Sequence, residues 1–106
     1  MAEPYVVIAI TRAFPGQAEK LQALEEELVV ATLQEPGCLR YELHQATNDE
    51  NMLVIIEAWE SEPDWRAHSE GAALQQFKAD GGSQSIERLE IIHLRRLAGG
   101  EPQSLR

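Results

Sequence analysis

The stretch Met52–His68, MLVIIEAWESEPDWRAH, brings together an acid, two indoles and an imidazole. Glu57 and Trp59 end a β-branched apolar run, and Trp65 and His68 follow shortly after it. A carboxylate or a neutral imidazole can accept a proton, and an indole can stack on an aromatic ring. What these residues can do depends on whether the corner they share faces a pocket.

A strand followed at once by a helix would place these side chains at one corner. Alternate side chains of a strand share a face, so Glu57 and Trp59 lie together. Ser61 is typical of a helix N-cap, with Pro63 in the first turn and Asp64 three residues after the cap. We expect this corner to edge a hollow beneath the helices.

The two candidate proton acceptors each have a structural alternative. His68 is either the general base or a helix-face histidine that packs or caps. Glu57 has apolar neighbours on its face, so burial would raise its pKa unless a partner compensates. It either accepts a proton or orients an imidazole, or it forms a buried ion pair with Arg40 or Arg95.

The other candidates are aromatic and imidazole side chains. Trp59 and Trp65 either stack on a ligand or pack in the core, and Tyr41 either binds a ligand oxygen or simply packs. His44 stands on the polar face of its predicted strand, at a pocket mouth or on the surface. His93 lies among apolar residues and is expected to be a core or interface histidine.

No local pattern predicts a metal site. The three histidines lack the close spacing of zinc ligands, and a single cysteine, Cys38, excludes a cysteine-rich centre and an internal disulfide. The pair Gly81–Gly82 is not a phosphate-binding motif. We therefore expect a site without metal.

The predicted elements follow the order strand, helix, strand, strand, helix, strand. Period-2 and β-branched runs predict strands, and three- and four-residue apolar spacing predicts helices. The strands are expected at Tyr5–Arg12, Cys38–Gln45, Met52–Trp59 and Ile86–Leu97, and the helices at Gln17–Gln34 and Glu62–Lys78. This order predicts an α+β, ferredoxin-like fold, a four-stranded antiparallel sheet with helices on one face.

Three local features complete this interpretation. In the first helix Glu25–Glu27 is expected to face outward, and Gly71 is expected to break the second helical region. Asp80–Ser83 is predicted to be a loop. Residues 1–97 then form a single domain, and residues 98–106 form a flexible tail.

Two of the predicted strands carry apolar side chains on both faces, Val6–Ile10 and Met52–Ile56. Helices cover one face of such a sheet, and a large uncovered apolar face is unusual for a monomer. We therefore predict that an identical chain covers the second face in a two-fold homodimer packed sheet against sheet.

The overall charge argues against two classes of partner. Nine Lys and Arg against eighteen Asp and Glu give a net charge of −9, which repels nucleic acid and anionic membrane surfaces. The N-terminus lacks a basic segment followed by an apolar run, and no apolar stretch approaches membrane-spanning length. A cytoplasmic location is expected.

Two segments and one histidine resemble a known family. EPGCLRYELH at 35–44, IEAWES at 56–61 and His68 resemble the antibiotic biosynthesis monooxygenase (ABM) family, in its quinol monooxygenase type. The resemblance spans about residues 5–97 and implies a dimeric α+β barrel. Relatives that degrade haem carry an Asn in the first strand, and this chain has none there, which disfavours that activity.

The resemblance also implies a reaction. Members of the monooxygenase type need no flavin, haem or metal, so the expected function is cofactor-independent oxidation of a small quinol-like or polyphenolic aromatic with molecular oxygen. There are two alternatives. One is an isomerase or other non-oxygenase acting on a small oxygenated metabolite, and the other is a non-catalytic ligand-binding or stress-associated dimer. The expected catalytic residues are His68 and Glu57, and the expected substrate contacts are Trp59, Tyr41, His44 and Trp65.

Overall fold

A computed structural model describes residues 3–100 of the chain. In chain order the elements are β1 (Tyr5–Ala13), α1 (Ala18–Thr32), β2 (Cys38–Ala46), β3 (Asp49–Trp59), α2 (Glu62–Ser69), α3 (Ala72–Ala79), α4 (Gly82–Ser85) and β4 (Ile86–Leu94). The predicted order of strands and helices is confirmed. The predicted tail lies largely outside the described residues.

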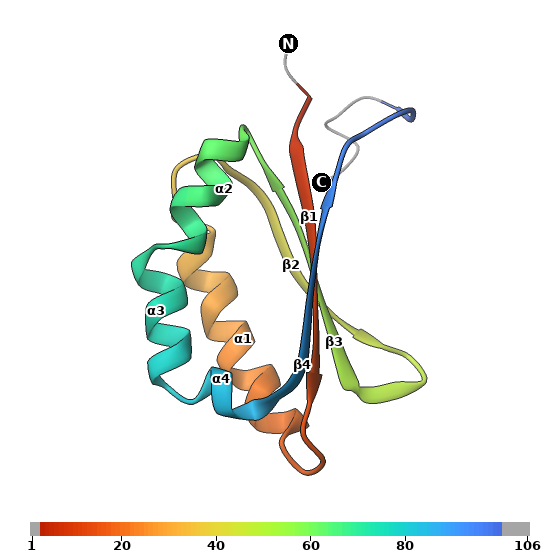
Figure 1. The fold of residues 1–106 in the computed structure, drawn as a ribbon, viewed down its shortest axis with the longest axis vertical. Coiled ribbons are helices and arrows are strands. Elements are labelled where there is room, and N and C mark those ends of the chain that lie inside the picture. The colour runs from red at the N-terminus through yellow and green to blue at the C-terminus, as the bar shows by residue number, and fades with distance from the viewer. Residues whose placement is uncertain (1–2, 101–106) are drawn as a thin grey trace.

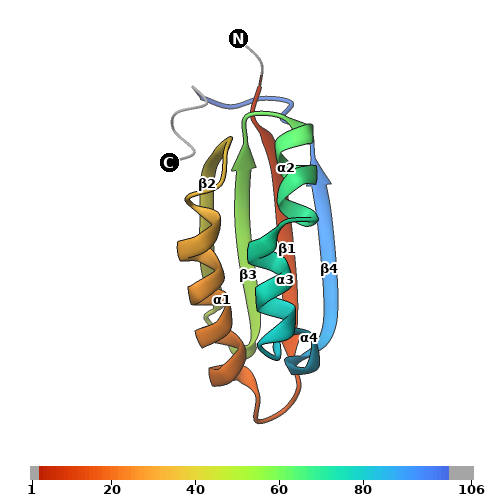
Figure 2. The same cartoon turned by 90° about the vertical axis from the view of Figure 1, so that its left-hand side faces the viewer.

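The four strands form one antiparallel sheet in the order β2-β3-β1-β4, with all the helices on one face (Figure 1). This is the predicted ferredoxin-like α+β fold. Figure 2 shows α1 in front of β2, and α2 and α3 in front of β3 and β1. The edge strand β4 has only the short α4 near one end, so most of its helix-side face lies uncovered.

The second helical region is broken at Gly71, as predicted. α2 ends at Ser69 and α3 begins at Ala72, with Gly71 in an extended conformation as the N-cap of α3. The predicted loop at Asp80–Ser83 is wrong in its second half, because α4 already begins at Gly82. Gly81 takes a left-handed conformation (φ 108°), which ends α3 and lets the chain turn directly into α4.

The expectation that Glu25 faces outward is wrong. Its side chain is 1% exposed and lies on the buried face of α1 with Leu21, Leu28 and Thr32. A residue four positions after Leu21 and three before Leu28 returns to the same face of a helix, whatever its polarity. Glu25 accepts a hydrogen bond from the Thr11 hydroxyl on β1 (2.9 Å), and burial raises the pKa of Glu25 to about 7.

The core lies between the helices and the facing side of the sheet. It contains Leu21 and Leu28 of α1, Phe77 of α3, and Leu53, Ile55 and Trp59 of β3. On the other face Val6, Ile8, Val54 and Ile56 are half-buried and no helix covers them. No helix of the described residues is long and apolar enough to cross a membrane.

Candidate functional site

The carboxyl group of Glu57 is held by its neighbour on the same face of β3. Trp59 Nε1–H donates to Glu57 Oε1 at 3.0 Å, and both residues are buried. Burial raises the pKa of Glu57 to about 7, and the indole hydrogen bond opposes that shift. The alternative of a buried ion pair is wrong within residues 3–100: the Arg40 guanidinium donates to Glu42 at 2.9 Å, and Arg95 is exposed and forms no ion pair with Glu57.

His68 lies over this pair from α2. Ser61 starts α2, accepting a hydrogen bond from Asp64 N at 3.2 Å, with Pro63 in the first turn as the sequence predicted. The His68 ring packs against Trp59 with centroids 4.8 Å apart and against Tyr41 at 5.3 Å. The acid, the indole and the imidazole therefore meet at the strand-to-helix corner.

A second carboxylate, which the sequence interpretation did not single out, orients this imidazole. His68 Nδ1 lies 2.7 Å from Glu35 Oε1 in the turn between α1 and β2. Burial lowers the pKa of His68, and the hydrogen bond and charge of Glu35 oppose that shift. A neutral ring whose Nδ1–H donates to a carboxylate has its lone pair on Nε2, which suits a general base.

Tyr41 completes this cluster on the neighbouring strand. It pairs with Glu57 across β2 and β3, and its ring also meets Trp59 edge to face with centroids 6.4 Å apart. Burial and the nearby carboxylates raise the pKa of Tyr41 well above its usual value, so its hydroxyl stays protonated. We call Glu35, Tyr41, Glu57, Trp59 and His68 the buried cluster.

Three members of the buried cluster are nearly closed to solvent. Glu57 is 3% exposed and His68 is 4% exposed, and Trp59 has no exposed surface. These three side chains therefore have almost no contact with bulk solvent in this conformation. α2 lays His68 directly onto the indole, with the two ring centroids 4.8 Å apart.

Trp65 belongs to a different group of aromatic rings. Its indole meets the His93 ring at right angles with centroids 4.6 Å apart, and the Tyr5 ring lies 6.3 Å away. The Tyr5 hydroxyl is 2.7 Å from His93 Nδ1. His93 is exposed, so the core alternative is wrong, and the interface alternative stays a prediction.

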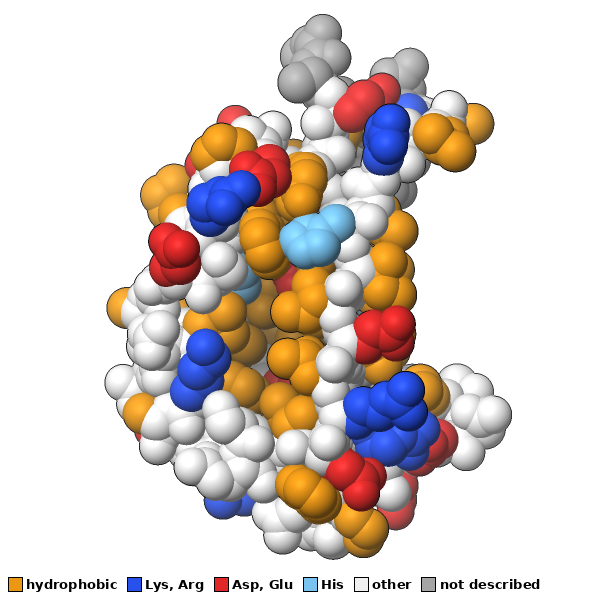
Figure 3. Space-filling model, viewed as in Figure 1, with side chains coloured by type: hydrophobic (Ala, Val, Ile, Leu, Met, Phe, Trp, Pro, Cys, Tyr) orange, Lys and Arg blue, Asp and Glu red, His pale blue; other side chains and the backbone are white. Residues whose placement is uncertain are grey.

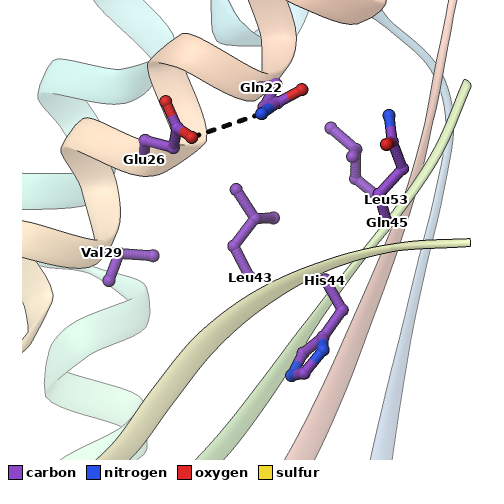
Figure 4. Close-up of a pocket in the computed structure, with 7 residues that line it drawn as sticks. All are labelled: Gln22, Glu26, Val29, Leu43, His44, Gln45 and Leu53. Carbon is purple, nitrogen blue, oxygen red and sulfur yellow. Dashed lines mark hydrogen bonds between the residues drawn. The ribbon is translucent and has the colours of Figure 1, made fainter. Parts of the chain in front are cut away.

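The predicted site residue His44 lies on the other face of the sheet. It is exposed and 3.2 Å from a Glu42 oxygen. A pocket of about 430 Å3 between α1 and β2 includes His44 in its rim, but none of the buried cluster. Figure 4 shows Leu43 pointing into this pocket and His44 pointing to the opposite side of β2.

A hollow of the surface runs between the helices and β4, and hydrophobic side chains line it (Figure 3). Leu89 and Ile91 pair with Thr11 and Ala9 of β1, so they lie on the helix side of the sheet. They are 55% and 45% exposed, which is unusual for large apolar side chains on the core side of a strand. We call this hollow the β4 groove.

Within residues 3–100 no group of three or more His, Cys, Asp or Glu side chains is arranged to hold a metal ion. The expectation of a site without metal or cofactor stays a prediction.

Comparison with known proteins identifies the family. The model of the family described as "Antibiotic biosynthesis monooxygenase" matches residues 4–80, most of the chain. This chain is an ABM protein. The matched segment includes every residue of the buried cluster and ends before β4.

Individual relatives are similar to this chain in sequence or in fold. The Bacillus subtilis protein "Putative monooxygenase YcnE" is 28% identical over 87 residues, covering 82% of this chain and 92% of YcnE. The crystal structure of PA3566 from Pseudomonas aeruginosa is 33% identical, with a TM-score of 0.85 over 92% of this chain and 98% of PA3566. Rv0793 from Mycobacterium tuberculosis, 23% identical over 93% of this chain and 100% of Rv0793, has a TM-score of 0.83 and supports the fold.

The resemblance seen in the sequence is thus confirmed at the level of the ABM family. The signal that could have identified Glu35 was present in it, since this glutamate opens the segment EPGCLRYELH. Only the fold shows that a residue before β2 and a residue on α2 become hydrogen-bond partners.

Proposed function

We propose that this ABM protein is a monooxygenase that oxidises a small quinol-like or polyphenolic aromatic with molecular oxygen and without a bound cofactor. The observation that carries the proposal is the His68–Glu35 pair, 2.7 Å apart, stacked on Trp59 and adjoining Tyr41. This arrangement combines an oriented base with aromatic rings that suit a flat ligand. Family membership supports the reaction class.

His68 is the proposed base. Its Nε2 makes no hydrogen bond to another residue of the range 3–100, so it is free to take a phenolic proton. The resulting electron-rich anion passes an electron to oxygen, and the two radicals combine into a ring peroxide. One oxygen atom stays on the ring as a quinone carbonyl and the other leaves as water, which balances a hydroquinone and O2 against a hydroxyquinone and water.

Glu57 is the proposed partner for the ligand oxygen. With its pKa near 7 the carboxyl group interchanges readily between donor and acceptor forms at neutral pH. When protonated it can donate to the oxyanion that His68 creates. Trp59 Nε1–H fixes the carboxyl group on the same face of β3 as the indole.

Ligand entry requires a rearrangement, because His68 and Glu57 are closed to solvent in this conformation. The route we propose leads from the β4 groove, whose apolar walls suit an aromatic ring. Movement of α2 would open it, because α2 carries both His68 and Trp65, three residues apart on one face.

Oxygen consumption tests this function. The wild-type chain should consume oxygen above background with at least one member of a panel of benzene and naphthalene hydroquinones. His68→Ala should lower that rate by about 100-fold, the usual contribution of a general base. Glu26→Gln, on the exposed side of α1, is the matched control and should keep full activity. Absence of uptake across the whole panel would contradict the proposal.

The closure of the buried cluster favours one second candidate, a ligand-binding protein without catalysis. That function predicts saturable binding of aromatic compounds, measured by quenching of tryptophan fluorescence, with no product formed in air. An isomerase or other non-oxygenase instead predicts product formed under argon. Parallel incubations with and without oxygen therefore separate the three functions.

We also propose that the chain works as a homodimer through the helix-free face. Its centre carries half-buried Ile8, Val54 and Ile56, an apolar surface that needs a cover. Val54→Lys should convert a dimer into a monomer in light scattering, while Glu87→Gln, exposed at the start of β4, should not. A wild-type chain that is monomeric at micromolar concentration would contradict this assembly.

A further inference from the structure

The imidazole that reaches solvent on the helix side of the sheet is that of His93. Of the three histidines, His68 is buried and His44 lies on the helix-free face. His93 pairs with Val7 of β1, so it lies on the same side as the core. Val7 also pairs with Glu57, which places His93 and Glu57 in one row across the sheet, roughly 10 Å apart at two strand spacings.

The His93 ring is held by side chains from two other elements. The Tyr5 hydroxyl at the start of β1 lies 2.7 Å from Nδ1, and the Trp65 indole of α2 stands against the ring at right angles. An exposed imidazole fixed from both sides is oriented, although it lies on an edge strand. Its Nε2 makes no hydrogen bond to any residue between positions 3 and 100.

The surroundings of His93 suit an aromatic ligand. Ile91 and Leu89 follow at two-residue steps along the same face of β4 and form an apolar wall of the β4 groove. His93 is therefore the polar group at one end of an exposed hydrophobic strip. Exposed apolar strips with a few fixed polar groups are typical of ligand sites.

Hydrogen bonding gives the two helix-side histidines opposite roles at Nε2. The Glu35 carboxylate can only accept, so His68 carries its proton on Nδ1 and a lone pair on Nε2. A phenol is a better donor than acceptor, so the Tyr5 hydroxyl donates to His93 Nδ1 and the ring carries its proton on Nε2. His68 is thus arranged to take a proton and His93 to give one.

We propose that His93 is a second catalytic residue, which protonates the departing oxygen of the ligand through Nε2, with Tyr5 as the positioning residue that feeds it a proton. This inference rests on the proposed monooxygenase function. It concerns a strand that lies outside the segment matched by the family model.

The proton transfers balance. The ring peroxide takes back the phenolic proton held by His68 and becomes a hydroperoxide. The hydroperoxide then loses its ring C–H proton to the neutral His68, which passes it to solvent, as the C=O bond forms and the O–O bond breaks. The leaving hydroxide takes the Nε2 proton of His93 and departs as water, while Nδ1 takes the hydroxyl proton of Tyr5. The tyrosinate then regains a proton from solvent, which matches the proton released from the ring. Oxygen, the co-substrate of the proposed function, is the only oxidant required.

Kinetics with 1,4-naphthohydroquinone test the proposal. His93→Ala should lower kcat by about 100-fold with KM changed less than about threefold, and added imidazole should restore part of kcat. His93→Gln keeps an N–H near the Nε2 position but cannot relay a proton, so it should remain slow with near-normal KM. Tyr5→Phe should lower kcat by about 10-fold, and Glu87→Gln is the control. A kcat within twofold of wild type in His93→Ala, or no rescue by imidazole, overturns the proposal.

A binding measurement separates this proposal from the proposed function. In protein with 15N-labelled histidine, 1,4-naphthoquinone, which has no phenolic proton for His68 to remove, should shift the Nε2 resonance of His93. The Tyr5→Phe variant should alter that shift because the ring is no longer held. A shift in a protein that oxidises no hydroquinone refutes the oxygenase function and retains the contact of His93 with the ligand. No shift at all overturns that contact and the proposal with it.

Discussion

His68 Nδ1 lies 2.7 Å from Glu35 Oε1, although the two residues are 33 positions apart in the chain. Glu35 is held in the turn that leaves α1, where its N–H donates to Thr32 O at 2.9 Å and its carbonyl accepts from Cys38 N at 3.3 Å. α2 brings His68 to it from the other side. The turn after α1 therefore positions the acid of this pair, and α2 positions the base.

Replacing Glu35 tests whether this pair acts in the reaction. Glu35→Gln keeps a hydrogen-bond acceptor for Nδ1 but removes the charge that favours the protonated ring, so the rate of hydroquinone oxidation should fall roughly 10- to 100-fold. Steady-state oxygen uptake measures it. Because the Glu35 carboxylate opposes the lowering of the His68 pKa, that pKa should fall further in the variant. A general base acts only when deprotonated, so the acidic limb of the pH–rate profile, which follows the His68 pKa, should move to lower pH. Unchanged kcat and unchanged pH profile would assign Glu35 a purely structural role.

The raised pKa of Glu57 predicts how stability depends on pH. Its ordinary pKa of 4.5 rises to about 7 in the folded chain, so between these values the folded state binds more protons than the unfolded state. The free energy of unfolding should therefore fall as pH rises from about 4.5 to about 7, by about 1 kcal/mol per pH unit at most for this group. Urea denaturation across this range should show a smaller slope for Glu57→Gln than for wild type. An equal slope in both proteins would contradict the assigned cause.

The buried pair Thr11 and Glu25 predicts a non-additive pair of mutations. Thr11→Val removes the 2.9 Å hydrogen bond and leaves a buried carboxyl group without a donor, which should cost about 1–3 kcal/mol. Adding Glu25→Met removes the buried acid as well, so the double variant should recover that loss and match or exceed wild type. Urea denaturation at pH 8 of the four proteins gives the coupling energy. Additive effects would show that the two groups do not interact.

Gly37 lies two residues after Glu35 and packs against the first turn of α2. Its φ of 78° disfavours any side chain, and a Cβ there would overlap the Asp64 side chain. Gly37→Ala should therefore destabilise the fold by about 2 kcal/mol or more, the sum of backbone strain and overlap. Gly16→Ala is a matched control. The φ of Gly16 is also positive, at 84°, but no atom lies within 4 Å of a Cβ added there. Equal losses of melting temperature in the two variants would mean that the overlap with Asp64 is relieved without cost.

The sequence predicted the corner that builds the buried cluster, and it did so for local reasons. The period-2 run that ends in Glu57 and Trp59 and the Ser61–Pro63 helix start are features of neighbouring residues, and both are confirmed. Glu25 lies on the buried face of α1, although its charge favours the solvent-facing side. The helical angle, which places it between Leu21 and Leu28, decides which face it shares.

By itself the sequence determined the order of the elements, the ferredoxin-like fold, the ABM family and which side chains share a face of each strand, since periodicity and short segments are written in consecutive residues. Only the tertiary structure decided which of these side chains meet: Glu35 with His68, Tyr5 with His93, and Trp65 away from Trp59. It also decided that the buried cluster is closed while β4 lies open. The physical reason is that partners from distant segments are set by strand order and by where the helices cross the sheet, and neither quantity is encoded in any single stretch of the chain.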